Sequence, residues 1–190
     1  HAGTGGDFDG QIIDDTGNGH DLSVWNESVD SGMYYRSDAP WWEVPLTWDS
    51  NRLSMENSGT LPGIFTATND VINQASWYAW TIETYFKADD LSGHRTMIGR
   101  DGQNVVNGNA SLSAMYFKAS SAGNAKPSTG FVNQDGKWNG VTSSQTISAG
   151  RWYHMAAVSD GATLKLYLDD LSVEGGSELV GSLDYSLDTV

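Results

Sequence analysis

The sequence predicts an all-β protein built as an antiparallel β-sandwich. Its 190 residues include 22 Gly, 8 Trp and 8 Tyr but only 4 Pro, and no stretch shows the hydrophobic period of a long helix. This composition favours many short strands joined by turns, packed as two sheets around one core. The length suits one core, so we expect residues 1–190 to form a single domain.

The clearest element is a β-hairpin over residues 152–168. Residues 152–158 alternate between two faces that are both largely apolar, which predicts a strand covered on both sides and places His154 in the core. Asp160 and Gly161 then favour a turn. Residues 163–168 return as a half-buried strand whose three leucines point inward.

Other segments are predicted as strands by their alternation, their β-branched and aromatic residues, and the turn residues beside them. They are residues 8–13, 22–25, 46–56, 78–87, 96–99, 111–119, 130–133, 138–147, 171–174 and 179–183. The strongest is 78–87, which places Trp80 and Phe86 on one face and Glu83 on the other. Residues 134–137 (Gln-Asp-Gly-Lys) predict a hairpin turn.

Three stretches resemble a known family. Residues 150–169 (G-x-W-Y-H-x-A-x-V-x-D-G-x-x-L-K-L-Y-L-D) resemble the central hairpin of the laminin-G-like, concanavalin-A-like jelly roll. Residues 80–87 (W-T-I-E-T-Y-F-K) and 14–22 (D-D-T-G-N-G-H-D-L) resemble two other parts of it, in the expected order. The resemblance implies a jelly roll that lacks its last strands in this chain. We therefore expect those strands to come from a C-terminal continuation or a second chain.

Charge excludes some partners and favours others. The formal net charge is −14, and such a surface repels the phosphates of nucleic acids. It suits solubility outside the cell, or binding of cations or neutral polymers. No apolar run is long enough for a membrane span. The start at His1 resembles a mature secreted protein, although an artificial boundary looks the same, and we expect secretion. The absence of Cys leaves the redox compartment open.

An acidic, glycine-containing loop near the N-terminus is a candidate structural calcium site. Its side-chain oxygens come from Asp14, Asp15, Asn18 and Asp21. Calcium prefers six to eight oxygen ligands from carboxylates and carbonyls, and some relatives of the resembled family bind calcium near this loop. The alternative is an Asx-type turn, in which these side chains bond their own backbone.

The preferred ligand surface is an aromatic, irregular stretch formed by Tyr34, Tyr35, Arg36, Trp41 and Trp42. Aromatic faces stack on the apolar faces of sugar rings, and neighbouring polar groups bond the hydroxyls. The alternative is that the two tryptophans close one end of the sandwich as a small satellite core.

Catalytic signatures are missing from the sequence. Glu83 has no acidic partner two or four residues away, as two carboxylates on one strand face would need. The four histidines lack zinc-site spacing. We therefore expect a non-catalytic extracellular binding module, most simply for carbohydrate. The alternatives are an accessory or structural domain of a larger secreted hydrolase, whose active site lies on other sequence, and an adhesion domain without glycan affinity.

Overall fold

The computed structural model describes residues 11–12, 18, 22–24, 35–41, 54–56, 64–66, 78–100, 115–133 and 137–185. The chain groups into two compact units, residues 1–75 and 76–190, and each is described by itself. All regular elements in the described ranges are strands. No helix among these residues is long and apolar enough to cross a membrane.

The first unit contains two small antiparallel sheets. One has the order β1-β2-β5, formed by β1 (Gln11–Ile12), β2 (Leu22–Val24) and β5 (Ile64–Thr66). In the other, β3 (Tyr35–Arg36) pairs with β4 (Ser54–Met55). β1, β2 and β4 fall inside predicted strands, whereas β3 and β5 were not predicted.

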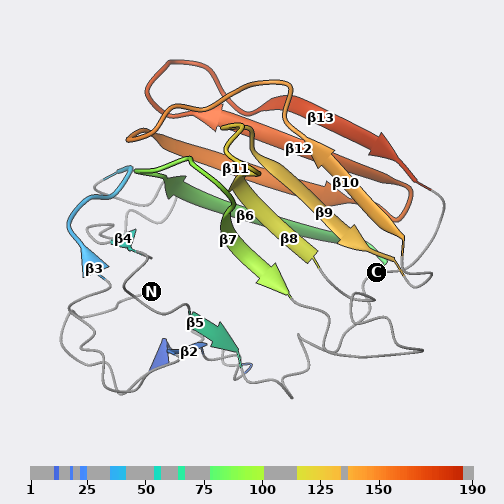
Figure 1. Cartoon of the computed structure of the whole chain (residues 1–190), viewed down its shortest axis with the longest axis horizontal. Helices are drawn as coiled ribbons and strands as arrows, with labels where there is room; N and C mark the ends of the chain where they lie inside the picture. Colours follow the sequence, from blue (N-terminus) through green and yellow to red (C-terminus); the bar gives the residue numbers. More distant parts are fainter. Residues whose placement is uncertain are drawn as a thin grey trace. The chain divides into compact units, whose positions relative to one another are not determined.

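The second unit is an antiparallel β-sandwich of two four-stranded sheets (Figure 1). One, the β6/β11–β13 sheet, has the order β13-β12-β11-β6. Its strands are β6 (Trp80–Lys87), β11 (Trp152–Ser159), β12 (Thr163–Asp170) and β13 (Glu178–Asp184). The other, the β7–β10 sheet, has the order β10-β9-β8-β7. Its strands are β7 (Arg95–Arg100), β8 (Met115–Ser120), β9 (Ser128–Val132) and β10 (Trp138–Thr142).

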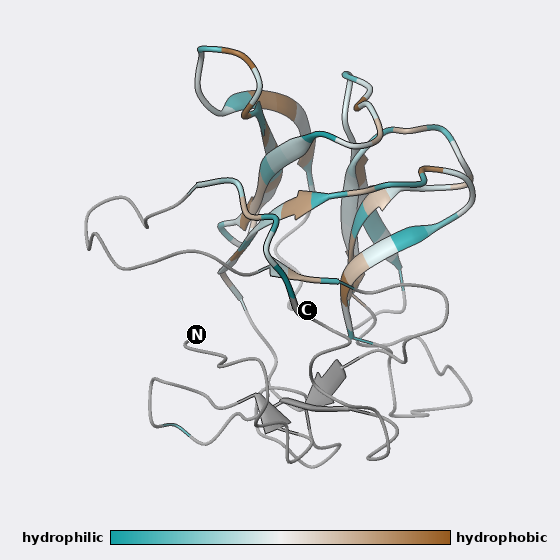
Figure 2. Ribbon diagram, turned by 90° about the vertical axis from the view of Figure 1, so that its left-hand side faces the viewer, coloured by the Kyte–Doolittle hydropathy of each residue, from teal (hydrophilic) through white to brown (hydrophobic). Residues whose placement is uncertain are grey.

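The core lies between these two sheets. Alternate residues of each strand point inward, so buried and more exposed positions alternate along β8, β11 and β12. Figure 2 shows hydrophobic and hydrophilic residues together within the strands of the sandwich. Phe117, Phe131, Met155, Leu164 and Leu166 are fully buried. The rings of Phe131 and Trp80 make a T-shaped contact across the sandwich, with 6.1 Å between ring centroids. The alternation therefore fixes which face of each sheet is covered.

The predicted hairpin is confirmed. β11 and β12 pair from Tyr153 opposite Asp170 to Ser159 opposite Leu164. In the turn, Oδ1 of Asp160 accepts hydrogen bonds from the backbone N–H groups of Ala162 (2.9 Å) and Thr163 (2.7 Å). These bonds lower the pKa of Asp160. Gly161 takes φ +91°, a conformation that L side chains rarely adopt.

Two predictions about this region are wrong. Residues 171–174 form a turn, because Asp170 Oδ1 accepts hydrogen bonds from the backbone N–H and the hydroxyl of Ser172. His154 is not a core residue. Its strand neighbours Tyr153 and Met155 point into the core, so His154 lies on the outer face and is half-buried.

The sandwich is tight where β10 meets β13. A Cβ on Gly181 would lie 2.6 Å from Cγ2 of Val141, so only glycine lets these strands approach so closely. The backbone N–H of Ser144 donates to the carbonyl of Val180 at 2.8 Å. This contact ties the β7–β10 sheet to the opposite sheet along that side.

Candidate functional site

The predicted aromatic stretch is described in part. Tyr35 and Arg36 form β3, and Arg36 makes an ion pair with Glu56. Trp41 is half-buried, while Tyr34 and Trp42 lie outside the described residues. The described residues therefore do not test whether these five side chains form one surface, and the ligand role of this stretch stays a prediction.

The predicted calcium loop lies almost wholly outside the described residues. Asn18 is described and exposed, and it has an interaction partner. Asp14, Asp15 and Asp21 are not among the described positions. The calcium site therefore stays a prediction from the sequence.

A second aromatic surface, absent from the sequence predictions, lies on the outer face of the β7–β10 sheet. Met115 and Phe117 of β8 point into the core. The alternate residues, Tyr116 and Lys118, therefore point outward. On β10, Val141 is buried and the side chain of Trp138 is 49% exposed. Tyr116 and Trp138 thus come from strands that are not adjacent, with β9 between them, yet their ring centroids are only 6.1 Å apart.

Two glycines bring these rings together. Gly130 of β9 is paired with Tyr116 on one side and Gly140 on the other. A Cβ on Gly130 would lie 2.3 Å from Cζ2 of Trp138, and one on Gly140 would lie 2.4 Å from its Nε1. The indole therefore packs directly against the backbone of the two glycines, and a side chain at either position would displace it from the sheet. Glycine inside a strand often marks such a close approach.

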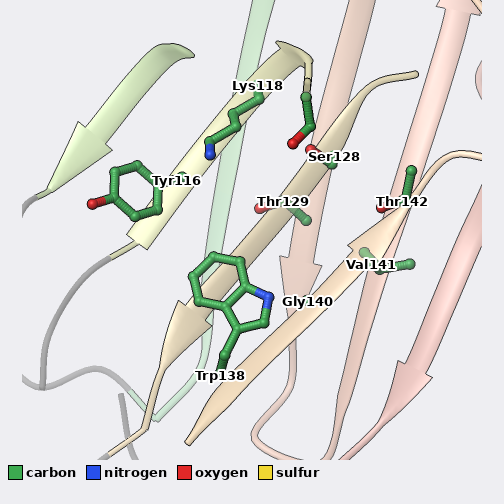
Figure 3. Close-up of a pocket in the computed structure, with 9 residues that line it drawn as sticks. Tyr116, Lys118, Ser128, Thr129, Trp138, Gly140, Val141 and Thr142 are labelled. Atoms are coloured by element: carbon green, nitrogen blue, oxygen red, sulfur yellow. The ribbon is translucent and has the colours of Figure 1, made fainter. Parts of the chain in front are cut away.

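A polar row borders the two rings (Figure 3). Ser128 of β9 is paired with Lys118 on β8 and with Thr142 on β10. These three residues therefore form a row across the sheet, two residues along each strand from Gly130, Tyr116 and Gly140. Residues two apart on a strand are about 7 Å apart, so the polar row lies beside the rings. The ammonium of Lys118 lies 4.7 Å from the Tyr116 ring centroid, a cation–π contact.

We call this surface the aromatic platform. It consists of Tyr116, Lys118, Ser128, Gly130, Trp138, Gly140 and Thr142, and all of these except Gly130 line a hollow of about 140 Å³. An exposed indole face supplies flat apolar area, and the hydroxyls and ammonium beside it supply directed hydrogen bonds. That combination suits a ligand whose faces are apolar and whose edges are polar.

The platform was missed because local sequence does not show which strands become neighbours. The alternation in residues 111–119 correctly placed Tyr116 and Lys118 on one face. One local signal was present. Gly140 follows Trp138 by two residues and therefore shares its face, which leaves the tryptophan free to lie flat.

The outer face of the opposite sheet carries a different cluster, centred on His154. The His154 ring stacks on Tyr85, with centroids 4.5 Å apart, and its Nε2 lies 3.5 Å from Oε2 of Glu83. Burial, and then the negative charges of Glu83 and Asp169, raise the pKa of Tyr85. Tyr85 is 46% exposed, and the stacked His154 ring lies against one of its faces. We assign no reaction to this cluster.

Comparison with known proteins gives one result. Residues 58–187 match the laminin G family model that is described as the concanavalin A-like lectin/glucanases superfamily. This match covers about two thirds of the chain and includes both sheets of the sandwich. No curated protein matches the chain.

Proposed function

The chain belongs to the concanavalin A-like lectin/glucanase superfamily, and from this premise we propose that it is a non-catalytic carbohydrate-binding module whose ligand stacks on the aromatic platform. The observation that carries the proposal is the Trp138 indole, half-exposed and lying over Gly130 and Gly140. A pyranose ring has an apolar face for the indole and equatorial hydroxyls for the polar row. The superfamily contains both binding and hydrolytic members, so the assignment has to come from the surface itself.

The chemistry of the platform favours binding over hydrolysis. Glycosidases of the common type place two carboxyl groups about 5–9 Å apart on either side of the scissile bond. Among the described residues that line the hollow there is no Asp or Glu. Serine, threonine and lysine in this arrangement can hold a sugar, but they lack the acid and nucleophile pair.

Two further features belong to the same proposal. A glycan-binding module of this kind acts outside the cell, where its acidic surface favours solubility. The loop with Asp14, Asp15, Asn18 and Asp21 is proposed as a structural calcium site, because its oxygens suit a hard cation. Both proposals rest on the sequence.

Binding to a panel of soluble glycans tests the function. We expect the 190-residue protein to bind at least one polysaccharide, and Trp138→Ala to weaken that binding about 30-fold, the loss typical of a central tryptophan anchor. Trp152→Ala is the matched control. Trp152 is also half-buried on an outer sheet face with a lysine near its ring, since the Lys87 ammonium lies 5.9 Å from its centroid.

The outcomes separate the alternatives. Affinity electrophoresis and calorimetry give binding, near-UV circular dichroism reports the fold of each variant, and a parallel series with EDTA reports any need for calcium. If Trp152→Ala loses as much affinity as Trp138→Ala, the platform is not the site. If no glycan binds with or without calcium, the carbohydrate function is wrong and an adhesion role becomes the better explanation.

A further inference from the structure

The platform carries a positive charge that no described carboxylate neutralises. Lys118 points along the outer face toward Tyr116, as Figure 3 shows, and among the described residues no Asp or Glu lies within ion-pair distance of its ammonium. Two other cations of the second unit are ion-paired, Arg95 with Asp90 and Arg151 with Asp170. Lys118 is therefore available to a ligand.

The charge around Lys118 contrasts with that of the whole chain. The four strands of the β7–β10 sheet contain no Asp or Glu, whereas those of the opposite sheet contain Glu83, Asp169, Asp170, Glu178 and Asp184. Residues 91–159 hold six of the ten basic residues. Of the 24 acids this stretch holds two, Asp101 and Asp135, both outside the described residues. Within the sandwich, the platform thus lies on the sheet whose strands contain no acidic residue.

We propose that the ligand is a polysaccharide containing hexuronate, whose uronate ring stacks on Trp138 and whose carboxylate meets the Lys118 ammonium. The inference rests on the carbohydrate function proposed above. Ser128 and Thr142, in the same row as Lys118, donate to the ring hydroxyls or to the second carboxylate oxygen. One ammonium matches one negative charge per sugar. A densely sulfated chain would instead need several cations to offset the net charge of −14.

Carboxyl reduction of the polymer provides the sharpest test. We would measure binding of polygalacturonate, polymannuronate and polyglucuronate, each beside its carboxyl-reduced neutral counterpart, in 20 mM and 500 mM NaCl without divalent cations. The wild-type protein should prefer at least one uronate polymer about tenfold over its reduced form at low salt, and lose that preference at high salt. A heparin arm identifies recognition of sulfate.

Variants locate the effect. Lys118→Gln should remove the tenfold preference while leaving binding of the reduced polymer within twofold, and Lys118→Arg should restore the preference. Lys165→Gln makes the same change in net charge on β12 of the opposite sheet, so it should keep the preference.

Each contrary result has a defined meaning. Equal binding of charged and reduced polymers, abolished by Trp138→Ala, overturns the uronate inference and leaves the carbohydrate function standing. Binding to heparin but to no polyuronate also overturns the inference. An equal loss in Lys165→Gln moves recognition away from the platform. Binding to none of these polymers, charged or neutral, overturns the uronate inference, and the glycan panel with and without calcium then decides whether the carbohydrate function stands.

Discussion

At the residue scale, Gly130 and Gly140 shape the aromatic platform because they have no side chains. Each leaves the space that the Trp138 indole fills, but their surroundings differ. The three atoms nearest to a Cβ on Gly140 would all belong to the indole, a side chain that can rotate away. A Cβ on Gly130 would also meet backbone atoms, the Asn139 carbonyl oxygen at 2.7 Å and Gly140 Cα at 2.8 Å. Substitutions at these two glycines therefore distinguish an effect on ligand binding from an effect on the stability of the fold.

We expect Gly140→Ala to abolish stacking on Trp138 while changing the free energy of unfolding by less than about 1 kcal/mol, because only the indole has to move. Gly130→Ala should lower the free energy of unfolding by about 1–3 kcal/mol, because backbone atoms resist the added methyl group. Urea denaturation and glycan binding of the two variants check this. Unchanged binding in Gly140→Ala would show that the flat indole is not what the ligand contacts.

Asp90 gives a pH-dependent expectation. Hydrogen bonds from the backbone and hydroxyl of Ser92, then that from Arg95, lower the pKa of Asp90 to about 2. Because the folded-state pKa lies below the ordinary value of 3.8, ionised Asp90 stabilises the fold at neutral pH. This contribution is lost as the pH falls from about 4 through 2. The group is fully exposed, so we expect a small effect.

Asp90→Ala should therefore lower the melting temperature at pH 7, and the difference from wild type should shrink steadily below pH 4. Thermal unfolding followed by circular dichroism between pH 7 and pH 2 measures it. Asp89→Ala, the adjacent exposed aspartate, is the control. A difference that stays constant down to pH 2 would mean that the Asp90 charge does not contribute.

At the scale of elements, the β11–β12 hairpin was predictable from sequence. The buried face was predictable for β12 but not for β11. Leucines alternating with polar residues fixed the inward face of β12. β11 is largely apolar on both faces, so its alternation did not distinguish Met155, which has no exposed surface, from His154, which lies outside. Pairing with β6 determines which face of β11 is buried, because His154 is opposite Tyr85 and Met155 is opposite Thr84. The strand predicted at residues 171–174 failed for another reason, the local hydrogen bonds of Asp170.

Truncating one leucine tests the covered face. Leu166 is fully buried, so Leu166→Ala should lower the free energy of unfolding by about 2–5 kcal/mol through lost contacts and the cavity left behind. Leu179 on β13 is 54% exposed, and Leu179→Ala should change the free energy of unfolding by about 0.5 kcal/mol or less. Denaturant titrations give both values. Similar losses in the two variants would contradict the assignment of the inner face.

For the whole molecule, the sequence predicts one domain over residues 1–190, and this stays a prediction. In the structure, residues 76–190 group into a compact unit. Among the residues that the structure describes, the buried core residues run from Trp80 to Val180 and come from that unit. The sandwich was predictable because periodicity and the three matched stretches are properties of the chain. The platform was not, since it depends on the order of strands within a sheet.

We expect residues 76–190, produced alone, to unfold in one cooperative transition and to keep the glycan affinity of the full chain, because they contain both the core and the platform. Thermal unfolding and calorimetry test this, and an unfolded fragment would support the single domain. Light scattering on the full chain tests the expectation of strands from a second chain. A native mass equal to one chain of 20.5 kDa would contradict it.

The unequal charge of the two sheets has a practical consequence. Packed sheets lie about 10 Å apart, close to the roughly 8 Å over which physiological salt screens charge, so each outer face acts largely by itself on its surroundings. Residues 76–190, produced alone, would adsorb to an anion-exchange resin through the acidic β6/β11–β13 sheet, and Lys118 on the other outer face would then face the solvent. Resin-bound protein would then remain able to capture a soluble anionic polymer, so its isoelectric point alone is a poor guide to its ligand.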